Sequence, residues 1–467
     1  MFSVGKRRVL TLGALLTSLT LNASVAFAGV GGDGIGDPYW PQDGNGGYRV
    51  GHYDVKVGYD PDKPDQLTGD TTVSATATTG LDRFNLDFTP TFDISTITVN
   101  GVPARGFARE GEHELVVTPA RPIRQGARFD VRVVYSGKNG DARYNPETGG
   151  MFVIGEPHSA TSWFPSNDHP SDKATFALTA TVPQGWTAVG NGRPGPTTTE
   201  RGRTTFRWRE DSPLATWTAV LAIAKFTVVN AALADGTPVI SAYAPGAEAA
   251  AREHGDRVPE IIDFLSSRFG KYPFSSAGGI YFNEDIALGL ETQSRPLYPG
   301  TAWPDVVGLI VHEQAHQWFG NNVTGRNWRD ICVAECFATY AQWMWSEAKE
   351  GKDLDAQYRE LVAANRDKPN FWKVPLYDPG AGTYLSAVYR TGPLMLHALR
   401  RGIGDDAFFR VLPIWQSLHR GGNASWPEFE QLAQRVSGVD LDDFFKAWTR
   451  STTIPADRYL YPGPLRP

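Results

Sequence analysis

Cysteine and methionine are scarce in this chain, and it contains no long run of like charge, no internal repeat and no low-complexity segment. Two cysteines among 467 residues cannot build a scaffold held by disulfides, so a hydrophobic core has to stabilise the fold. The net charge is −6 without a long basic run, which argues against nucleic acid or an anionic membrane surface as the main partner. The length predicts about two to four globular domains.

The first 28 residues have the composition of an export signal. Three basic residues at 6–8 precede an apolar stretch at 9–25, which ends at 26–28 in Ala-Phe-Ala, a sequence that signal peptidases accept. Polar residues interrupt the stretch, and no later segment reaches the roughly 18 consecutive apolar residues of a membrane span. We predict a signal peptide over residues 1–28, cleavage after Ala28, and a secreted protein without stable membrane insertion. Both the general and the twin-arginine export routes stay open.

Residues 29–235 show the alternation that is typical of half-buried β-strands. Apolar and polar residues alternate in four segments: 53–59, 73–77, 129–133 and 176–182. Asn-Gly pairs at 100–101 and 139–140 are candidates for hairpin turns. We predict an antiparallel β domain over 29–235, with a β-sandwich or a saddle-shaped pair of sheets.

After residue 235 the pattern changes to that of helices. Apolar residues at 247–269 recur at spacings of three and four, which predicts an amphipathic helix. The segment 280–290 has the pattern of a strand, and helical patterns dominate from Pro304 onward. We predict a second domain at 236–467 that is mixed α/β and mostly helical.

A five-residue motif in this second domain indicates a metal site. Residues 312–316 read His-Glu-Gln-Ala-His, and the apolar stretch before them at 306–311 predicts a buried helix. Residues four apart share one face of a helix, so His312 and His316 can bind the same ion. Glu313 lies about 100° around the helix from His312, where it can act as general base toward a water on that ion.

A catalytic zinc site of this kind needs a third protein ligand, and a carboxylate is one that zinc accepts. Glu335 follows His316 by 19 residues, within a segment at 333–344 whose pattern predicts another helix. Because residue types and spacings agree together, we predict one zinc ion bound by His312, His316 and Glu335. The same ligands can also accept other divalent ions.

With this motif, the chain resembles the gluzincin zinc aminopeptidases of the aminopeptidase N and leukotriene-hydrolase type. Further matching segments are 47–54, 163–165, 173–176, 317–324 and 328–330. The resemblance covers nearly all of the mature chain and implies an α+β multidomain fold, in which the N-terminal β domain precedes a thermolysin-like catalytic domain. It also implies a zinc-dependent aminopeptidase with one Zn2+ per chain, acting on peptides with free N-termini.

The resemblance assigns roles to three more residues. Glu156 and Glu291 stand where the family has residues that bind the α-amine of the substrate, and Tyr389 where it has a transition-state tyrosine. The chemistry agrees, because two carboxylates can hold a free ammonium group by charge-assisted hydrogen bonds and would reject an acetylated N-terminus. A phenol hydroxyl can stabilise the oxyanion of a tetrahedral intermediate.

The sequence departs from the family pattern at several positions. Around Glu291, the G-x-M-E-N pattern has Leu288 in place of its Gly and Thr292 in place of its Asn, which alters backbone contacts to the substrate. Cys336 follows the third ligand where a glycine is usual. The chain ends soon after 441–448, without the large C-terminal helical domain of longer relatives, so we expect a more open cleft.

The two cysteines, Cys332 and Cys336, bracket Glu335. In an oxidising compartment they can form a disulfide, but four residues apart on a regular helix their Cα atoms are near the long end of the allowed range, about 6 Å. The geometry improves if Cys332 lies just before the helix. The alternative is a pair of buried thiols that act as small apolar groups.

Three other functions share these motifs: a zinc endopeptidase, a hydrolase of a non-peptide substrate such as an epoxide, and a non-catalytic binding protein on the same fold. Glu156 and Glu291 disfavour an endopeptidase, which has no free amine to bind. The intact zinc motif disfavours a protein without catalysis. No motif encodes the preferred N-terminal side chain, the physiological substrate or the oligomeric state.

Overall fold

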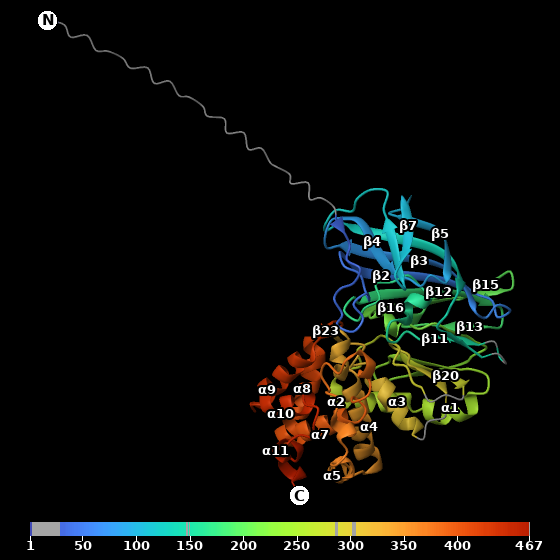
Figure 1. Ribbon diagram of the computed structural model, residues 1–467. Helices are drawn as coiled ribbons and strands as arrows, with labels where there is room; N and C mark the ends of the chain where they lie inside the picture. The colour runs from blue at the N-terminus through green and yellow to red at the C-terminus, as the bar shows by residue number, and fades with distance from the viewer. Residues whose placement is uncertain (2–28, 146–147, 149, 285–287, 301–304, 467) are drawn as a thin grey trace.

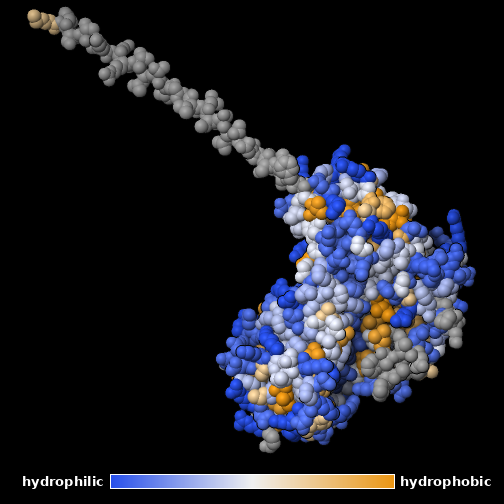
Figure 2. All heavy atoms as spheres, viewed as in Figure 1, coloured by the Kyte–Doolittle hydropathy of each residue, from blue (hydrophilic) through white to orange (hydrophobic). Residues whose placement is uncertain are grey.

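The computed structural model describes Met1 and residues 29–466 except 146–147, 149, 285–287 and 301–304 (Figure 1). The segment predicted as a signal peptide therefore lies outside the described residues, apart from Met1. Among the described helices, none combines the length and apolarity that crossing a bilayer requires. The face in Figure 2 is mostly hydrophilic, and its apolar residues gather in small patches.

The N-terminal part is built on one nine-stranded sheet. In order across the sheet its strands are β14 (Arg193–Pro194), β16 (Arg203–Leu214), β12 (Ala174–Pro183), β2 (Tyr48–Tyr59), β3 (Gln66–Ala77), β9 (Arg128–Lys138), β5 (Phe92–Val99) and β6 (Val102–Pro103), while β15 (Thr198–Glu200) pairs with β16. The strand pairs are antiparallel as predicted, except β2 with β12, which are parallel. This exception arises because the chain leaves the sheet after β9 and later returns beside β2 in the same direction.

The two predicted hairpin turns had different outcomes. Asn100 and Gly101 join β5 to β6, and both have positive φ angles, 52° and 75°, as a two-residue hairpin turn requires. The prediction at Asn139 is wrong, because β10 (Ala142–Tyr144) pairs with another sheet and not with β9. Asn139 instead lies where the chain passes from the large sheet to the sheet of β10. Its side chain stabilises this connection by accepting a hydrogen bond from the Ala142 amide at 3.0 Å.

Two four-stranded sheets complete the β region. One consists of β1 (Gly29–Val30), β4 (Leu81–Asp87), β8 (Glu114–Thr118) and β7 (Gly106–Glu110), and the other of β10, β11 (Met151–Val153), β17 (Ala222–Ala224) and β13 (Thr187–Val189). Phe84 of β4 packs against Tyr48 and Phe129 of the large sheet, with ring centroids 6.0 and 5.4 Å apart. This packing of sheet on sheet gives the predicted sandwich.

A fourth sheet connects the β region to the helices. Its strands are β18 (Thr227–Ala232), β19 (Pro238–Tyr243), β20 (Ala277–Glu284) and β21 (Leu297–Gly300). Along β19, Val239 and Tyr243 belong to the core of the helical region, whereas Ile240 and Ala242 belong to the core of the β region. The predicted strand at 280–290 corresponds to β20, but its bounds are wrong, since β20 ends at Glu284 and 288–290 form no strand, while 285–287 lie outside the described residues. The domain boundary at residue 235 falls between β18 and β19 and stays a prediction.

Helices make up most of the C-terminal part, as predicted (Figure 1). They are α1 (Glu248–Gly255), α2 (Val258–Phe269), α3 (Val306–Ala315), α4 (Glu335–Glu350), α5 (Leu354–Asn365), α6 (Pro369–Trp372), α7 (Thr391–Ile403), α8 (Asp405–Leu418), α9 (Trp426–Ser437), α10 (Asp442–Thr449) and α11 (Asp457–Leu460). Short 3-10 turns are η1 (Ser159–Ser162), η2 (Thr216–Thr218), η3 (Trp328–Val333), η4 (Ala381–Thr383) and η5 (Gly463–Leu465), and β22 (Thr324–Gly325) pairs with β23 (Asn423–Ala424).

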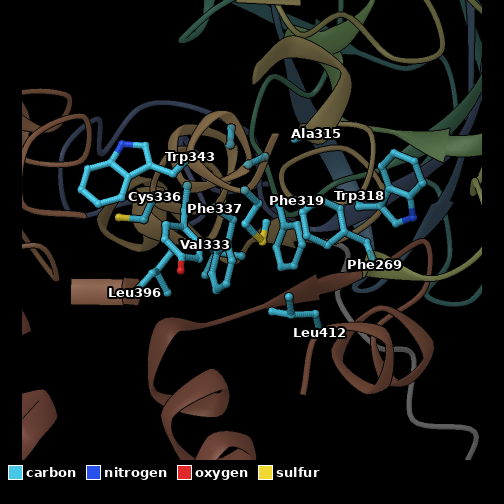
Figure 3. Close-up of a cluster of buried hydrophobic side chains, with 14 of the residues drawn as sticks. Phe269, Ala315, Trp318, Phe319, Val333, Cys336, Phe337, Trp343, Leu396 and Leu412 are labelled. Carbon is cyan, nitrogen blue, oxygen red and sulfur yellow. The ribbon is translucent and has the colours of Figure 1, made fainter. Parts of the chain in front are cut away.

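Aromatic packing fixes α3 against α4. Phe319, just after α3, stacks on Phe337 of α4 with ring centroids 4.2 Å apart (Figure 3). Trp318 and Phe269 extend this cluster toward α2, and their ring centroids are 5.8 Å apart. Because buried aromatic pairs hold defined geometries, the two helices that carry the metal motif are held in one relative position.

Candidate metal centre

Helix α3 presents the zinc motif from a buried position. Asp305 caps the helix by accepting a hydrogen bond from the Gly308 amide at 2.8 Å, and the residues from 308 to 315 are all buried. His316 follows the last helical residue with helical φ and ψ angles, so the spacing of a regular turn is kept. The rings of His312 and His316 accordingly lie on the same side, with centroids 4.8 Å apart.

Glu335, the first residue of α4, completes the predicted ligand set. Its Oε2 lies 3.2 Å from Nε2 of His312 and 3.5 Å from Nε2 of His316. All three side chains are buried, and their ligand atoms lie within 4.8 Å of one another. Two imidazole nitrogens and one carboxylate converging in this way match the donors of a catalytic zinc site that keeps a fourth position open.

The outer nitrogens of both histidines are held by other groups. His312 Nδ1 lies 3.2 Å from Oε1 of Gln342, and His316 Nδ1 lies 2.9 Å from the Phe319 carbonyl oxygen. A hydrogen bond from Nδ1 leaves the Nε2 lone pair for the metal and orients each ring. Gln342 was not predicted, although it lies seven residues after Glu335 and therefore on nearly the same helix face.

The Glu335 carboxylate and the two imidazoles shift one another's pKa values. Burial opposes ionisation of Glu335, but the two imidazoles outweigh it and hold the pKa of this carboxyl well below its usual range. Burial likewise lowers the pKa of His316, but the surrounding carboxylates, above all Glu335, raise it to about 10. Binding of a cation to this set would therefore be coupled to the release of a proton.

Glu313 lies beside the ligand set without joining it. It is buried, and this burial together with the nearby Glu291 carboxylate raises its pKa well above the usual value. Its carboxylate lies against the backbone of Gly289, where any Cβ atom would collide with Glu313 Oε1. A glycine at this position thus lets the predicted general base approach the 288–292 segment closely.

Glu156 and Glu291, the predicted amine-binding residues, converge on the same place. Together with Glu335 they offer carboxylate oxygens that all lie within 4.8 Å of one another. Burial raises the pKa of Glu291 to about 7, and one oxygen of Glu156 is buried without a hydrogen-bond partner among the described residues. A substrate ammonium group would satisfy both carboxylates.

The segment after α3 fastens Glu291 to the zinc helix. Asn321 Nδ2 donates a hydrogen bond to the Glu291 carbonyl oxygen at 2.6 Å, and the Ser294 amide donates to Gln317 Oε1 at 2.7 Å. The half-buried Lys173, from the β region of the chain, donates from its ammonium group to the Asn321 carbonyl at 2.6 Å. Gln317, Asn321 and Lys173 lie in family-like segments but received no individual role, and their hydrogen bonds set the distance between Glu291 and the zinc helix.

Tyr389 reaches the site from the residues just before α7. Its ring centroid lies 5.9 Å from that of His312, and the side chain is 45% exposed, so it forms part of the rim. Desolvation and the surrounding carboxylates raise its pKa well above the usual value, which keeps the hydroxyl protonated as a hydrogen-bond donor. The start of α7 packs closely against α4, since a Cβ atom added at Gly392 would lie 2.7 Å from Cys336 Sγ. This close packing supports the position of Tyr389, three residues earlier.

A second tyrosine near the site was missed by sequence reasoning. Burial raises the pKa of Tyr384, and three nearby carboxylates raise it further, those of Glu156, Glu335 and Glu291. The Tyr384 hydroxyl therefore lies close enough to feel their negative charge. Its ring packs against Trp40 and Trp328, with centroids 5.4 and 6.0 Å away.

Cys332 and Cys336 form a disulfide, which settles the alternative that the sequence left open. Their Cα atoms are 4.8 Å apart, well within the allowed range. The distance is shorter than on a regular helix because Cys332 lies in η3 and Cys336 in the first turn of α4. The bond closes a loop that contains Glu335.

Replacing both cysteines with alanine should destabilise the protein by about 2 kcal/mol, the value that chain entropy predicts for a loop of about five residues. Because Glu335 lies inside this loop, we also expect weaker zinc binding. Calorimetric unfolding measures the first effect, and competition with a chelator measures the second. Unchanged values for both would mean that the packing of η3 on α4 suffices to hold Glu335.

Comparison with known proteins decides the family. The chain matches the Peptidase M1 N-terminal domain model over residues 50–217 and the Peptidase family M1 domain model over residues 300–448. The chain belongs to the M1 peptidase family. Its β region and its helical region correspond to the two domains of that family, and the His-His-Glu set provides a site for one zinc ion.

Solved structures resemble this M1 chain over most of its length. The M1 zinc metallopeptidase from Deinococcus radiodurans is 29% identical with a TM-score of 0.82, and the match covers 91% of this chain and 98% of that one. Among curated relatives, aminopeptidase N of Streptomyces lividans is 24% identical over 65% of this chain. A probable aminopeptidase 2 of Sulfurisphaera tokodaii is 23% identical over 63% of this chain. The matches cover only 38% and 40% of these two relatives.

Proposed function

We propose that this M1 family member is a secreted, zinc-dependent aminopeptidase that releases the N-terminal residue of peptides. The observation that carries the proposal is the position of the Glu156 and Glu291 carboxylates directly beside the zinc ligands. They can hold a charged amine at a fixed, short distance from the metal, so that only the first peptide bond reaches it. In support, relatives are named aminopeptidases, and a variant of the Deinococcus radiodurans enzyme was solved with the tripeptide Tyr-Ser-Ala bound.

The side chains of the site can divide the reaction among them. When bound, the zinc ion supplies a Lewis acid that polarises the scissile carbonyl and lowers the pKa of water. Glu313 accepts a proton from the attacking water and passes it to the leaving amine, a task that suits a carboxyl with a raised pKa. The Tyr389 hydroxyl donates a hydrogen bond to the developing oxyanion.

The alternatives differ from the proposal in what they need near the metal. An endopeptidase needs an extended groove and has no use for buried carboxylates that lack partners, such as Glu156. A hydrolase of non-peptide substrates would need none of the amine anchors. A non-catalytic binding protein would have no reason to keep Glu313 beside a complete ligand set.

One peptide in two versions tests the proposal. The purified protein, starting at Gly29, is offered the peptide with a free and with an acetylated N-terminus, each with and without a zinc chelator. We expect loss of single N-terminal residues from the free peptide alone, and no cleavage after chelation. Internal cleavage of both versions would instead identify an endopeptidase. Mass spectrometry of the exported protein's N-terminus tests cleavage after Ala28.

The variant Glu291→Gln tests the amine anchor. Losing one charge-assisted hydrogen bond of about 1.5–3 kcal/mol should lower kcat/KM for a free peptide by about 10- to 100-fold, mainly through KM. Steady-state kinetics measure this change, and Glu253→Gln, an exposed position on α1, is the matched control. An unchanged kcat/KM would remove Glu291 from the substrate site.

A further inference from the structure

A second group of metal-ligating side chains lies in the β region, outside the active site. Asp87 is the last residue of β4, Glu114 is the first residue of β8, and His113 directly precedes it. One ligand atom from each of these three residues lies within 4.8 Å of the others. Asp43, from the segment before β2, contributes a fourth carboxylate close to His113.

The sheet places two of these carboxylates opposite each other. Asp87 and Glu114 are direct partners in the antiparallel pair of β4 and β8, so their side chains point to the same face. Both are buried, with exposed fractions of 0% and 3%. Like charges at such a position repel each other, and burial adds to the cost, so the pair requires a compensating positive charge or a proton.

Among the described residues, Glu114 has little compensation beyond the nearby Asn85 side chain. Neither of its two carboxylate oxygens has a hydrogen-bond partner among the described residues. Buried carboxylates in folded proteins normally have partners, and each unpaired group costs folding free energy. An unpartnered carboxylate that is directed at Asp87 and His113 therefore points to a missing ligand.

The distances around His113 suit a metal ion better than hydrogen bonds. Its Nε2 atom lies 3.6 Å from Asp87 Oδ1 and 3.8 Å from Asp43 Oδ1, beyond hydrogen-bonding range. Ligand atoms around a tetrahedral zinc ion, each about 2.0–2.2 Å from the metal, are about 3.4 Å apart. The ligand atoms of Asp87, His113 and Glu114, now within 4.8 Å of one another, would have to contract to about this spacing, and Asp43, outside that group, would have to move further.

The candidate ligands are oriented by further hydrogen bonds. Asp87 Oδ1 accepts from Asn45 Nδ2 at 2.9 Å, and its Oδ2 accepts from the Asp168 amide at 2.6 Å. Asp43 Oδ2 lies 2.8 Å from Nδ1 of His158. Carboxylates that bind metals are typically held by such outer partners.

We propose that Asp87, His113 and Glu114, with Asp43 as fourth ligand, bind a second divalent cation of the zinc class, structural rather than catalytic. One imidazole among carboxylates favours zinc over calcium or magnesium, which prefer oxygen ligands alone. The ion would tie the segment before β2 to β4 and β8. Trp40 of that segment packs against Trp328 and Tyr384 at the active site, with centroids 5.5 and 5.4 Å away. The ion would thus steady one wall of the active site from a distance.

Metal analysis of the purified full-length chain tests the proposal, independently of any peptidase activity. We expect two zinc ions per chain in the wild type by plasma mass spectrometry. Glu114→Gln should leave only the ion at the catalytic set, and His316→Ala should leave only the ion in the β region. Glu112→Gln, next to the site but exposed, is the matched control and should keep two.

The same variants separate a bound cation from a protonated carboxyl. If Glu114 is simply protonated, a glutamine of the same shape leaves both the zinc content and the zinc dependence of the melting temperature unchanged, which would overturn the proposal. One zinc ion in the wild type would overturn it as well. We expect the metal-free wild type to gain stability in two steps as zinc is added, and Glu114→Gln in one. If Glu114→Gln does not fold, His113→Gln replaces it with the same expected loss.

Discussion

In the variant Glu313→Gln we expect kcat for a free peptide to fall by about 100- to 10,000-fold, the range associated with loss of general acid–base catalysis. Glutamine keeps the size of the side chain but cannot accept a proton from water. Since Glu313 is not among the ligands, the zinc content should stay at the wild-type value. Stopped assays of peptide hydrolysis combined with metal analysis measure both quantities.

The structure offers a matched control for this variant. Glu350 ends α4, the helix of Glu335, with its side chain exposed, so Glu350→Gln should leave kcat unchanged. The decisive comparison is between activity and metal content in the same preparation. If Glu313→Gln kept wild-type activity, another group would have to move the proton. If it lost zinc, its effect would be structural and the assignment as general base would fail.

Replacing Glu335 with glutamine should remove the zinc ion from the catalytic set. The carboxylate supplies the negative charge of the ligand set, and the two imidazoles that it contacts at 3.2 and 3.5 Å would otherwise face a neutral amide. The loss of zinc affinity should exceed the roughly 10- to 100-fold that follows when only an outer hydrogen-bond partner is removed. Competition with a chelator measures the affinity.

Gln342→Ala supplies that smaller reference effect, since Gln342 contacts only the outer nitrogen of His312. The expected order of zinc affinity is wild type, then Gln342→Ala, then Glu335→Gln. In the wild type, zinc has to displace the proton held at His316, whose pKa is about 10, so affinity should rise with pH below that value. An inverted order, or affinity that falls as pH rises from 6 to 8, would contradict the ligand assignment.

Hydrogen bonds connect Glu291, the proposed amine anchor, to the helix that carries the predicted zinc ligands. Gln317 and Asn321 belong to the continuation of the zinc helix, and both hold the segment that carries Glu291. Lys173 adds a contact from the β region to the same loop. In the proposed aminopeptidase, this cross-linking would set the distance from the substrate amine to the metal, and with it the specificity for the first bond. Lys173 directly precedes β12, from where its ammonium group reaches the loop.

The sequence alone determined what depends on local spacing. Two histidines four apart on an apolar helix share one face whatever surrounds them, so His312 and His316 could be assigned without a structure. Asn100 and Gly101 set a two-residue turn by their own φ preferences. The residue types of the motif also indicated zinc as the metal, and the family resemblance supplied Glu156, Glu291 and Tyr389, whose roles stay predictions.

Only the tertiary structure decided which distant residues meet. Gln342, Asn321 and Lys173 act on the site through contacts between elements, and no local pattern encodes such contacts. The disulfide depended on where α4 begins, because one residue of shift in that boundary changes the Cα separation of the two cysteines. The pairing of Asp87 with Glu114 depended on strand register, which long-range packing sets. Local chemistry therefore identified the metal centre, while packing across the chain determined what surrounds it.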